Sequence, residues 1–432
     1  MNFSQSVLRR SALYQNDSFL PSDRHLSRPS DQLAELVRRS RRDRIFRSKL
    51  ASRPVAAAAV AGIMLDHGET AALREIGQTV FACKDDELEV LARRRRRWKM
   101  DRQQETAAQR LFAHRASITE KTSRILRRLD IPERLCRLLR RSLDEGAVWA
   151  EMAPCLPAID FPAAIAACVG ADIEQATPVS VAGLLYYLGI SMVDDVIDRE
   201  VEINWGDTPG EQVTMAGICL FSGLPMQAIR MLCDKRVKSC RLLDCYDIFE
   251  RACYQMAVGQ YLDIGSDFAE STTIDDCRRI IELKTGSTGE LVATLSASMA
   301  GSTPETADSM ARSCKYLYMS MQMASDIHDI WSKPISPDLA NGIVTLPTLY
   351  AFHASRDGLR APFRDQLQSH DWTESGHAEM RRHITSTGAL CYSVLQAEAT
   401  RQRAISAWSE CAVESLGAHL FDYMFEAAKL MD

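Results

Sequence analysis

Residues 181–193 read VAGLLYYLGISMV, a run of thirteen residues without a charge that leads directly into two aspartates. A helix over this run would be apolar on every face, and such a helix is buried inside a fold rather than laid on its surface. Asp194 and Asp195 would then stand at the end of a core helix. Because buried carboxylates are costly without a compensating cation, the run predicts a helical core built around a cation site.

A second acidic segment, SDIHD at 325–329, follows the first, DDVID at 194–198, after about 130 residues. Residues i, i+1 and i+4 share one face of an α-helix, so each segment directs its oxygen atoms toward a single point. Two such faces turned toward each other would hold hard cations, and a diphosphate could bridge those cations. The pair of segments therefore predicts an enzyme that removes a diphosphate from its substrate.

The composition is that of a soluble globular protein, with 46% hydrophobic and 25% charged residues in a chain of 432. The net charge of −5 does not indicate a nucleic-acid binder. Thirteen cysteines without a CxxC pair suit a reducing cytoplasm, and the nine histidines form no zinc-like cluster with them. No apolar run reaches the roughly 18–20 residues that a membrane helix needs. We therefore expect a cytoplasmic protein that is not an integral membrane protein.

Three regions differ in composition. Residues 1–30 are rich in Ser, Asp, Arg and Pro without periodicity, so we predict a disordered N-terminus. Residues 31–130 look helical but contain arginine-rich runs at 38–44 and 93–97, which favour a solvated helix face over a nucleic-acid or anionic-membrane patch. This extension has no chemical role that the sequence reveals. Residues 131–432 are a succession of helical patterns with short connections, as in a large all-α bundle.

Further polar groups lie on apolar helices between and after the two acidic segments. They are Gln260 and Asp263 in GQYLD at 259–263, Lys284 and Thr285 in ELKTG at 282–286, Gln322 four residues before Asp326, and then Lys333, Asp338 and the GIVTLP segment at 342–347. A lysine beside a metal-held diphosphate would stabilise the negative charge that grows on the leaving group.

In order along the chain, these segments form the series DDxxD, GQxxD, KTG, QxxxDxxD, K, DL and GxxTLP. The series resembles the trans-isoprenyl diphosphate synthase, or polyprenyl synthetase, family over roughly residues 145–355. The resemblance implies the all-α isoprenoid synthase fold in residues 131–432, here with an N-terminal helical extension. It also implies a Mg²⁺-dependent enzyme with three magnesium ions, an allylic prenyl diphosphate as substrate, and a homodimer.

The resemblance further implies a role for each residue of the series. The metal ligands would be Asp194, Asp195 and Asp198 at the first site and Asp326 and Asp329 at the second, where Ser325 replaces a usual aspartate and can still offer its hydroxyl. The substrate-binding residues would be Lys284 and Lys333 on the diphosphate, Thr285 and Gln260 near the reacting carbon, and Gln322 on the face of Asp326.

Two basic motifs of the family are missing. The stretch EMAPCLPA at 151–158 has no basic residue where the family has a GGKRxRP-like segment, and REVEINW at 199–205 lacks an arginine pair. In the family these groups bind the diphosphate of isopentenyl diphosphate, and a diphosphate does not sit in a buried apolar pocket without cations. Similar losses mark the terpene cyclases derived from this family and the bacterial prenyltransferases that modify a competence-pheromone peptide.

We therefore expect an enzyme that ionises an allylic prenyl diphosphate and transfers the prenyl group to a non-isopentenyl acceptor, a peptide or a small aromatic molecule. A terpene synthase that cyclises its substrate, with no acceptor, is one alternative. Ordinary chain elongation is another, and it would require Arg137, Arg140 and Arg141 to fill the empty anion site. A non-catalytic partner subunit is the third, and the intact carboxylates and Lys284 count against it.

The resemblance also bears on the length of the substrate's hydrocarbon tail. In the family the tail runs along the helix of the first acidic segment, and a bulky residue about five positions before the first aspartate stops a short chain. That position is Gly189 here, so we expect the tail to pass it. Tyr186 lies about 4.5 Å deeper at 1.5 Å per residue, close to one isoprene unit. We expect a C15 to C20 substrate with Tyr186 as the floor or, alternatively, Tyr186 as a core aromatic residue.

Overall fold

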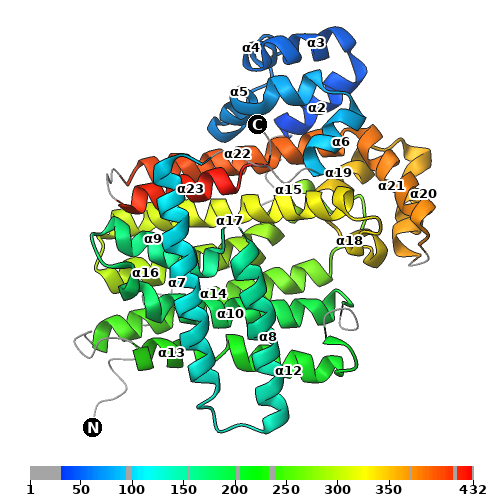
Figure 1. Cartoon of the computed structure of the whole chain (residues 1–432). Coiled ribbons are helices and arrows are strands. Elements are labelled where there is room, and N and C mark those ends of the chain that lie inside the picture. Colours follow the sequence, from blue (N-terminus) through cyan, green and yellow to red (C-terminus); the bar gives the residue numbers. More distant parts are fainter. Residues whose placement is uncertain are drawn as a thin grey trace, which may run out of the picture.

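The structure, a computed structural model, describes residues 31–93, 100–153, 155–200, 205–232, 239–369, 372–411 and 416–430 (Figure 1). Within these ranges, helices follow one another through short turns and no strand is present. The prediction of an all-α fold is therefore confirmed. The prediction for residues 1–30 lies outside the described part of the chain.

The main body is a bundle of long helices joined by short turns. In chain order it contains α7 (Arg102–Leu126), α8 (Glu133–Met152), α9 (Pro157–Cys168), the 3-10 turn η2 (Ile173–Ala176), α10 (Thr177–Ile197), α12 (Gly210–Phe221), α13 (Leu224–Leu232), α14 (Ser239–Ile264), α15 (Ile274–Ile281), the π-helical turn η3 (Glu282–Gly286), α16 (Ser287–Ala300), α17 (Pro304–Ser332), α18 (Pro337–Asn341), α19 (Leu346–Ala354), α20 (Asp357–Gln368), α21 (Glu374–Thr387), α22 (Ala389–Ser409) and α23 (Leu416–Ala427).

The apolar helix predicted at 181–193 is α10, and it lies at the centre of the bundle. It packs against α9, α12, α13 and α16. All residues from Thr177 to Gly189 except Tyr187 are buried, and from Ile190 to the end of the helix all except Met192 are partly exposed. The prediction of a core helix that ends in carboxylates is therefore confirmed.

Two glycines face each other where α10 crosses α12. A Cβ atom on Gly189 would lie 2.6 Å from the carbonyl oxygen of Gly217 and 2.6 Å from the backbone nitrogen of Phe221. A Cβ atom on Gly217 would in turn lie 2.7 Å from the carbonyl oxygen of Gly189. The expectation that Gly189 leaves a passage for the substrate tail is therefore wrong, because the backbone of α12 occupies that space.

Two helical stretches are long and apolar enough to cross a membrane by length and composition alone. The first, Ile173–Ile197, contains α10, and 78% of its most apolar window is buried inside the protein. The second, Gly210–Leu232, comprises α12 and α13, and 44% of its window is buried. The burial of the first stretch follows from its position at the centre of the bundle.

Five shorter helices form a separate layer at one end of the bundle, at the top of Figure 1. They are α2 (Gln32–Arg42), α3 (Arg44–Ser52), α4 (Pro54–Val60), α5 (His67–Ala82) and α6 (Asp85–Arg93). The layer packs on the bundle mainly through α5 on α22 and α6 on α17. By contrast, α7 packs against the bundle helices α8, α9, α10 and α23. The division of the chain at residue 130 stays a prediction.

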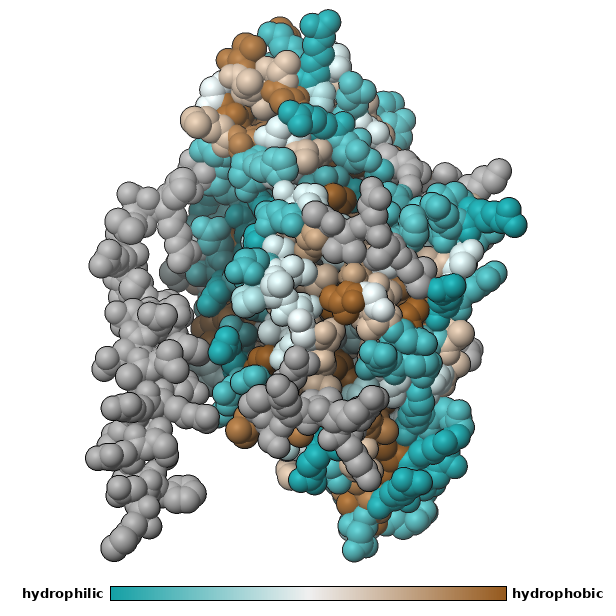
Figure 2. Space-filling model, turned by 90° about the vertical axis from the view of Figure 1, so that its left-hand side faces the viewer, coloured by the Kyte–Doolittle hydropathy of each residue, from teal (hydrophilic) through white to brown (hydrophobic). Residues whose placement is uncertain are grey.

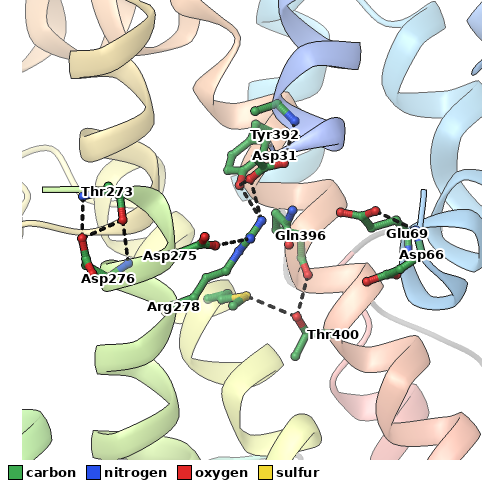
Figure 3. A network of polar contacts seen from close by, with 12 residues as sticks. Asp31, Asp66, Glu69, Thr273, Asp275, Asp276, Arg278, Tyr392, Gln396 and Thr400 are labelled. Carbon is green, nitrogen blue, oxygen red and sulfur yellow. Dashed lines mark hydrogen bonds and ion pairs between the residues drawn. The ribbon is translucent and has the colours of Figure 1, made fainter. Parts of the chain in front are cut away.

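A polar network ties the N-terminal layer to the bundle (Figure 3). Asp31, which caps α2 by accepting from the backbone N–H of Ala34, also accepts from the hydroxyl of Tyr392 at 2.5 Å and from the guanidinium of Arg278 at 2.7 Å. Arg278 lies in α15, six residues before Lys284. The layer is thus anchored to the helix that leads into the KTG segment.

Candidate active site

Lys284 brings three separate segments of the chain together. Its ammonium group lies 3.2 Å from Oδ1 of Asp194 at the end of α10 and 2.5 Å from Oδ2 of Asp263 near the end of α14. Burial works against the charged form of Lys284, but Asp194 and Asp263 outweigh this effect and hold its pKa above the usual value. The lysine therefore stays positively charged at neutral pH.

The backbone around Lys284 departs from regular helix. Residues 282–286 form the π-helical turn η3 between α15 and α16, and single π-helical turns within helices are frequent at functional sites. The turn approaches α14 closely, since a Cβ atom on Gly259 would lie 2.7 Å from the backbone nitrogen of Lys284. The glycine of the GQYLD segment thus lets the backbone of Lys284 lie against α14.

The second acidic segment lies in the last two turns of α17. Asp326 accepts a hydrogen bond from Nε2 of Gln322 at 2.9 Å, and Oε1 of Gln322 accepts one from the hydroxyl of Thr285 at 3.3 Å. This chain of contacts connects η3 with α17. It supports the expectation that Thr285 and Gln322 belong to the same site as Asp326.

Asp329 is held by the loop that follows α17. Its Oδ1 accepts from the ammonium of Lys333 at 2.7 Å, and its Oδ2 accepts from the hydroxyl of Ser336 at 2.5 Å and from the backbone N–H of Asp338 at 3.3 Å. Lys333 therefore reaches the site through Asp329, while about half of its side chain is exposed to solvent.

The two acidic segments face each other. Nδ2 of Asn341, in α18, donates to the carbonyl oxygen of Asp198 at 2.7 Å. The pKa of Asp338 is raised well above its usual value, first by burial and then by the charges of Asp329, Asp326 and Asp198. Asp338 therefore lies close to carboxylates of both acidic segments. The carboxylates of α10 and α17 therefore border one common space.

Two aspartates that border this space have raised pKa values. Burial and the charge of Asp194 raise the pKa of Asp198 to about 8, even though Lys284 opposes the shift. Burial raises the pKa of Asp326 to about 7, with a further contribution from Asp263, although its hydrogen bond with Gln322 opposes the shift. Crowded carboxylates with raised pKa values are the expected property of a site that takes up cations.

The donor set fits Mg²⁺ bound together with a phosphate ligand. All candidate ligands are oxygen atoms, which Mg²⁺ prefers. Within the ranges that the structure describes, no three His, Cys, Asp or Glu side chains converge on one point, so the chain alone offers no closed cage. Proteins usually bind Mg²⁺ through one or two carboxylates plus substrate phosphates, and the two facing segments have this arrangement.

The remaining predicted residues lie around this space in different environments. Ser325 is exposed, whereas Asp326 and Asp329 beside it are buried. Gln260 is buried, and its Nε2 has no hydrogen-bond partner in the described part of the chain. The roles of Ser325 and Gln260 stay predictions. An unpartnered buried amide is costly in a finished core, which favours a ligand contact for Gln260.

The sequence analysis missed Trp205, which lies where an arginine pair was sought. Its indole Nε1 donates to Oδ2 of Asp195 at 2.6 Å. The guanidinium of Arg141 lies over the indole ring, 5.4 Å from its centre, and donates to the backbone carbonyl of Trp205 at 3.3 Å. No local pattern could reveal this contact, because the tryptophan follows Asp195 by ten residues across a turn.

A buried arginine also lies near the stretch without basic residues. Arg115, in α7, is only 2% exposed, and it donates to the carbonyl of Ala153 at 2.7 Å and to Oδ1 of Asp160 at 2.8 Å. Asp160 in turn accepts from the backbone N–H of Leu156 at 2.6 Å. This arginine therefore holds α7 and the start of α9 together, and its charge is compensated by Asp160.

Tyr186 belongs to an aromatic cluster between α10, α12 and α14. Its ring centre lies 6.4 Å from that of Phe221 and 5.7 Å from that of Phe249 in edge-to-face geometry. The hydroxyl is buried without a well-formed hydrogen bond to another described residue, and burial raises its pKa. Tyr186, Ile190 and Asp194 are spaced four residues apart and share one face of α10.

Comparisons with known proteins point to one family. The family model that describes polyprenyl synthetases matches residues 164–381. The geranylgeranyl diphosphate synthase of Methanosarcina mazei is 26% identical over 235 residues, which cover 51% of this chain and 68% of the relative. The (2E,6E)-farnesyl diphosphate synthase of Mycobacterium bovis is 25% identical over 263 residues, which cover 53% of this chain and 70% of the relative.

Solved structures of similar proteins share the fold at low sequence identity. The geranylgeranyl pyrophosphate synthetase from Geoglobus acetivorans superimposes with a TM-score of 0.62 at 17% identity, covering 74% of this chain and 99% of that protein. The polyprenyl synthase from Caulobacter crescentus, solved with calcium and isoprenyl diphosphate, gives 0.61 at 18% identity, covering 75% and 97%. These likenesses confirm the predicted isoprenoid synthase fold.

Proposed function

This chain belongs to the polyprenyl synthetase family of prenyltransferases, and we propose that it ionises an allylic prenyl diphosphate and transfers the prenyl group to an acceptor other than isopentenyl diphosphate. The observation that carries the first half is the common space bordered by both acidic segments, with Lys284 between Asp194 and Asp263. The observation that carries the second half is in the sequence, where the stretches 151–158 and 199–205 lack the basic motifs that bind a second diphosphate in the family.

The residues of the site divide the work of ionisation. Bound Mg²⁺ would neutralise the diphosphate and polarise the bond to the allylic carbon. Asp194, Asp195 and Asp198 would hold the ions on one side, and Asp326 and Asp329 on the other, with three ions in all. Because Lys284 stays charged, its ammonium would stabilise the negative charge that develops on the departing diphosphate.

The allylic cation needs a water-free surrounding. The face of α10 above Asp194 presents Ile190 and then Tyr186, which is fully buried against Phe221 and Phe249. A tail laid along this face would exclude water from the reacting carbon. If the tail ends at Tyr186, this face of α10 has room for a C15 to C20 chain. Tyr186 alone would then limit the length of the tail, because Gly189 is covered by α12.

Two contacts support an acceptor other than isopentenyl diphosphate. Trp205 places an indole N–H on Asp195 where the family has arginine, and Arg141 packs over that ring. Arg115, the arginine beside the 151–158 stretch, is bound to Asp160 and Ala153 inside the core. A neutral acceptor, such as an aromatic side chain of a peptide or a small aromatic molecule, needs neither arginine.

Chain elongation is the second candidate. It is favoured by the names of the curated relatives, which are geranylgeranyl and farnesyl diphosphate synthases. It requires basic groups beside the acceptor, for which Arg137, Arg140 and Arg141 are the candidates. Of these three, only Arg140 has a buried nitrogen, Nε, without a hydrogen-bond partner in the described part of the chain. A cyclising enzyme would need no acceptor and would release a hydrocarbon or alcohol from the same ionisation step.

We further propose that the enzyme is a cytoplasmic homodimer whose interface includes α14. This helix exposes large apolar side chains along its length, namely Leu243, Tyr246, Tyr254, Tyr261, Leu262 and Ile264. Exposed apolar side chains gathered on one helix are typical of interaction sites. Light scattering after size-exclusion chromatography tests the dimer, and Tyr254→Ser combined with Tyr261→Ser should shift it toward monomer.

The experiment that tests the proposed function follows diphosphate release and product mass together. Purified protein with Mg²⁺ and C10, C15 or C20 allylic diphosphate is incubated alone, with isopentenyl diphosphate, and with tryptophan-containing peptides or small aromatic acceptors. The proposal expects Mg²⁺-dependent diphosphate release and a prenylated aromatic product. Release with a cyclic hydrocarbon as sole product supports the cyclase, and absence of any release contradicts an ionising enzyme.

A further inference from the structure

The tip of the N-terminal layer exposes three large aliphatic side chains. Ile45 at the start of α3 is 71% exposed, Val60 at the end of α4 is 88% exposed, and Met64 in the turn after α4 is 83% exposed. A space-filling view shows an apolar patch at the same end of the molecule, at the top, where α3 and α4 lie (Figures 1 and 2). Single exposed apolar residues are ordinary, but a group at one projecting end is not.

The three side chains come from segments that meet around one guanidinium. Nη1 of Arg39, in α2, donates to the carbonyl of Ala61 at 3.5 Å, and its Cζ lies 4.7 Å from the centre of the Phe46 ring. Val60 directly precedes Ala61 in the chain, and Ile45 directly precedes Phe46. Gly62, with a φ of +74°, then makes the exposed turn that leads to Met64. The apolar side chains therefore belong to one surface.

The same surface is basic on an acidic protein. Residues 43–66 contain four basic residues and two acidic ones, Asp43 and Asp66 at the two ends of the segment, while the whole chain has a net charge of −5. Arg44, Lys49 and Arg53 are exposed. The fourth, Arg47, donates to the carbonyls of Phe81 and Cys83 and so contributes to packing inside the layer. The tip thus combines exposed aliphatic side chains with three exposed positive charges.

We propose that this tip, formed by α3, α4 and the turn at 61–65, docks the protein reversibly on the surface of an anionic lipid bilayer. Ile45, Val60 and Met64 would insert between the headgroups, and Arg44, Lys49 and Arg53 would contact their phosphates. Aliphatic tips with basic neighbours fit a bilayer better than a nucleic acid, because base stacking needs exposed aromatic rings. The docking surface lies at the far end of the molecule from the bundle helices α12 and α13 (Figure 1).

The inference adds a location to the enzyme and does not depend on which acceptor it uses. Prenyl compounds are apolar and partition into bilayers, so an enzyme that handles them gains from a position at the lipid surface. Since no helix of the tip is long enough to span a bilayer, the attachment would be peripheral and sensitive to salt.

Vesicle flotation of the full chain tests the proposal. The vesicles contain either phosphatidylcholine alone or phosphatidylcholine with a large share of phosphatidylglycerol. We expect the wild type to float with the anionic vesicles at low salt and to dissociate at high salt. Neutralising Arg44→Gln, Lys49→Gln and Arg53→Gln should weaken partitioning by about fivefold per residue. Ile45→Ser with Val60→Ser and Met64→Ser should weaken it by at least about tenfold.

Matched controls distinguish binding through the tip from non-specific hydrophobic adsorption to the vesicles. Leu359→Ser with Val169→Ser removes two other exposed apolar side chains outside the tip and should leave flotation unchanged. Circular dichroism and Mg²⁺-dependent diphosphate release in detergent-free buffer should match the wild type for every variant, because none of these residues lies in the active site.

Several results would overturn the docking proposal. These are a wild type that does not float with anionic vesicles, a tip variant that floats as well as the wild type, or tip variants that change the oligomeric state instead. Retention on double-stranded DNA that is lost in the charge variant and kept in the apolar variant would assign the tip to nucleic acid. Each of these outcomes leaves the proposed prenyl transfer untouched, since that is read from diphosphate release.

Discussion

The ammonium of Lys284 lies 3.2 Å from a carboxylate oxygen of Asp194, although 90 residues separate the two in sequence. This contact joins the end of the buried helix α10 to the π-helical turn η3. Through Thr285 and Gln322 the turn also reaches Asp326. Three polar segments that stand out in the sequence, those of Asp194, Lys284 and Asp326, are therefore linked by side-chain contacts.

Loss of Asp194 should abolish most of the ionisation. Asp194→Ala should lower the rate of diphosphate release by at least roughly two orders of magnitude, the scale for losing a positioned group that stabilises the transition state. Asp329→Ala should lower it less, because Ser325 suggests a looser second site. Single-turnover measurements with a C15 diphosphate check both, with Asp308→Ala in an exposed turn of α17 as the control. Near-normal turnover of folded Asp194→Ala would show that the metal assignment is wrong.

Magnesium and protons should compete for the site. Because Asp198 and Asp326 have pKa values of about 8 and about 7, ion binding must displace protons from them at neutral pH. Mg²⁺ affinity in the presence of a substrate analogue should therefore increase from pH 6 to pH 9. Calorimetry in two buffers of different ionisation enthalpy measures the released protons, and Asp198→Asn should reduce their number.

The same raised pKa values predict how stability varies with pH without metal. Each of these aspartates has a higher pKa in the folded state than in the unfolded state, where the pKa is about 3.9. Its contribution to stability is fully present below about pH 3.9 and is lost as the pH rises through the folded pKa. The melting temperature of the metal-free protein should therefore fall as the pH rises from about 5 to about 8. Asp198→Asn should flatten this fall, and a melting temperature that rises over the interval would contradict the crowding of carboxylates.

Trp205 should tune the first metal site through Asp195. Trp205→Phe removes the indole N–H that donates to Asp195 and keeps an aromatic ring beneath Arg141. Loss of such a supporting partner typically costs 10–100-fold in metal affinity. The Mg²⁺ concentration for half-maximal rate should thus increase by roughly tenfold, while Trp408→Phe, on the stacked contact between α22 and α23, should leave it unchanged.

Tyr186 and Gly189 should respond to substitution in different ways. Tyr186→Ala should deepen the space above Asp194 and selectively improve the longest of the C15, C20 and C25 substrates. Gly189→Ala should instead cost about 1–3 kcal/mol of stability, because its Cβ would meet the backbone of Gly217 and Phe221 at 2.6 Å. An unchanged substrate preference in Tyr186→Ala would show that Tyr186 is a core residue only.

The local features of the site could be predicted from the sequence, because helix periodicity alone places Asp194, Asp195 and Asp198 on one face and buries the run before them. The expectation that Lys284 and Asp194 serve one site followed only from the resemblance to a family, and the direct contact between them was not predicted. Contacts across the fold had no local signal. Gly189 was interpreted as open space because the helix that covers it was unknown, and Trp205 was interpreted only as a missing arginine.

We propose above all that this chain keeps the allylic half of the family's machinery and has lost the isopentenyl half. Incorporation of labelled isopentenyl diphosphate, measured with C10, C15 and C20 primers and Mg²⁺, tests it most directly. We predict diphosphate release from the C15 or C20 primer with little or no label in any extended product. Efficient addition of labelled C5 units to any primer would contradict the claim and assign the protein to the chain-elongating synthases.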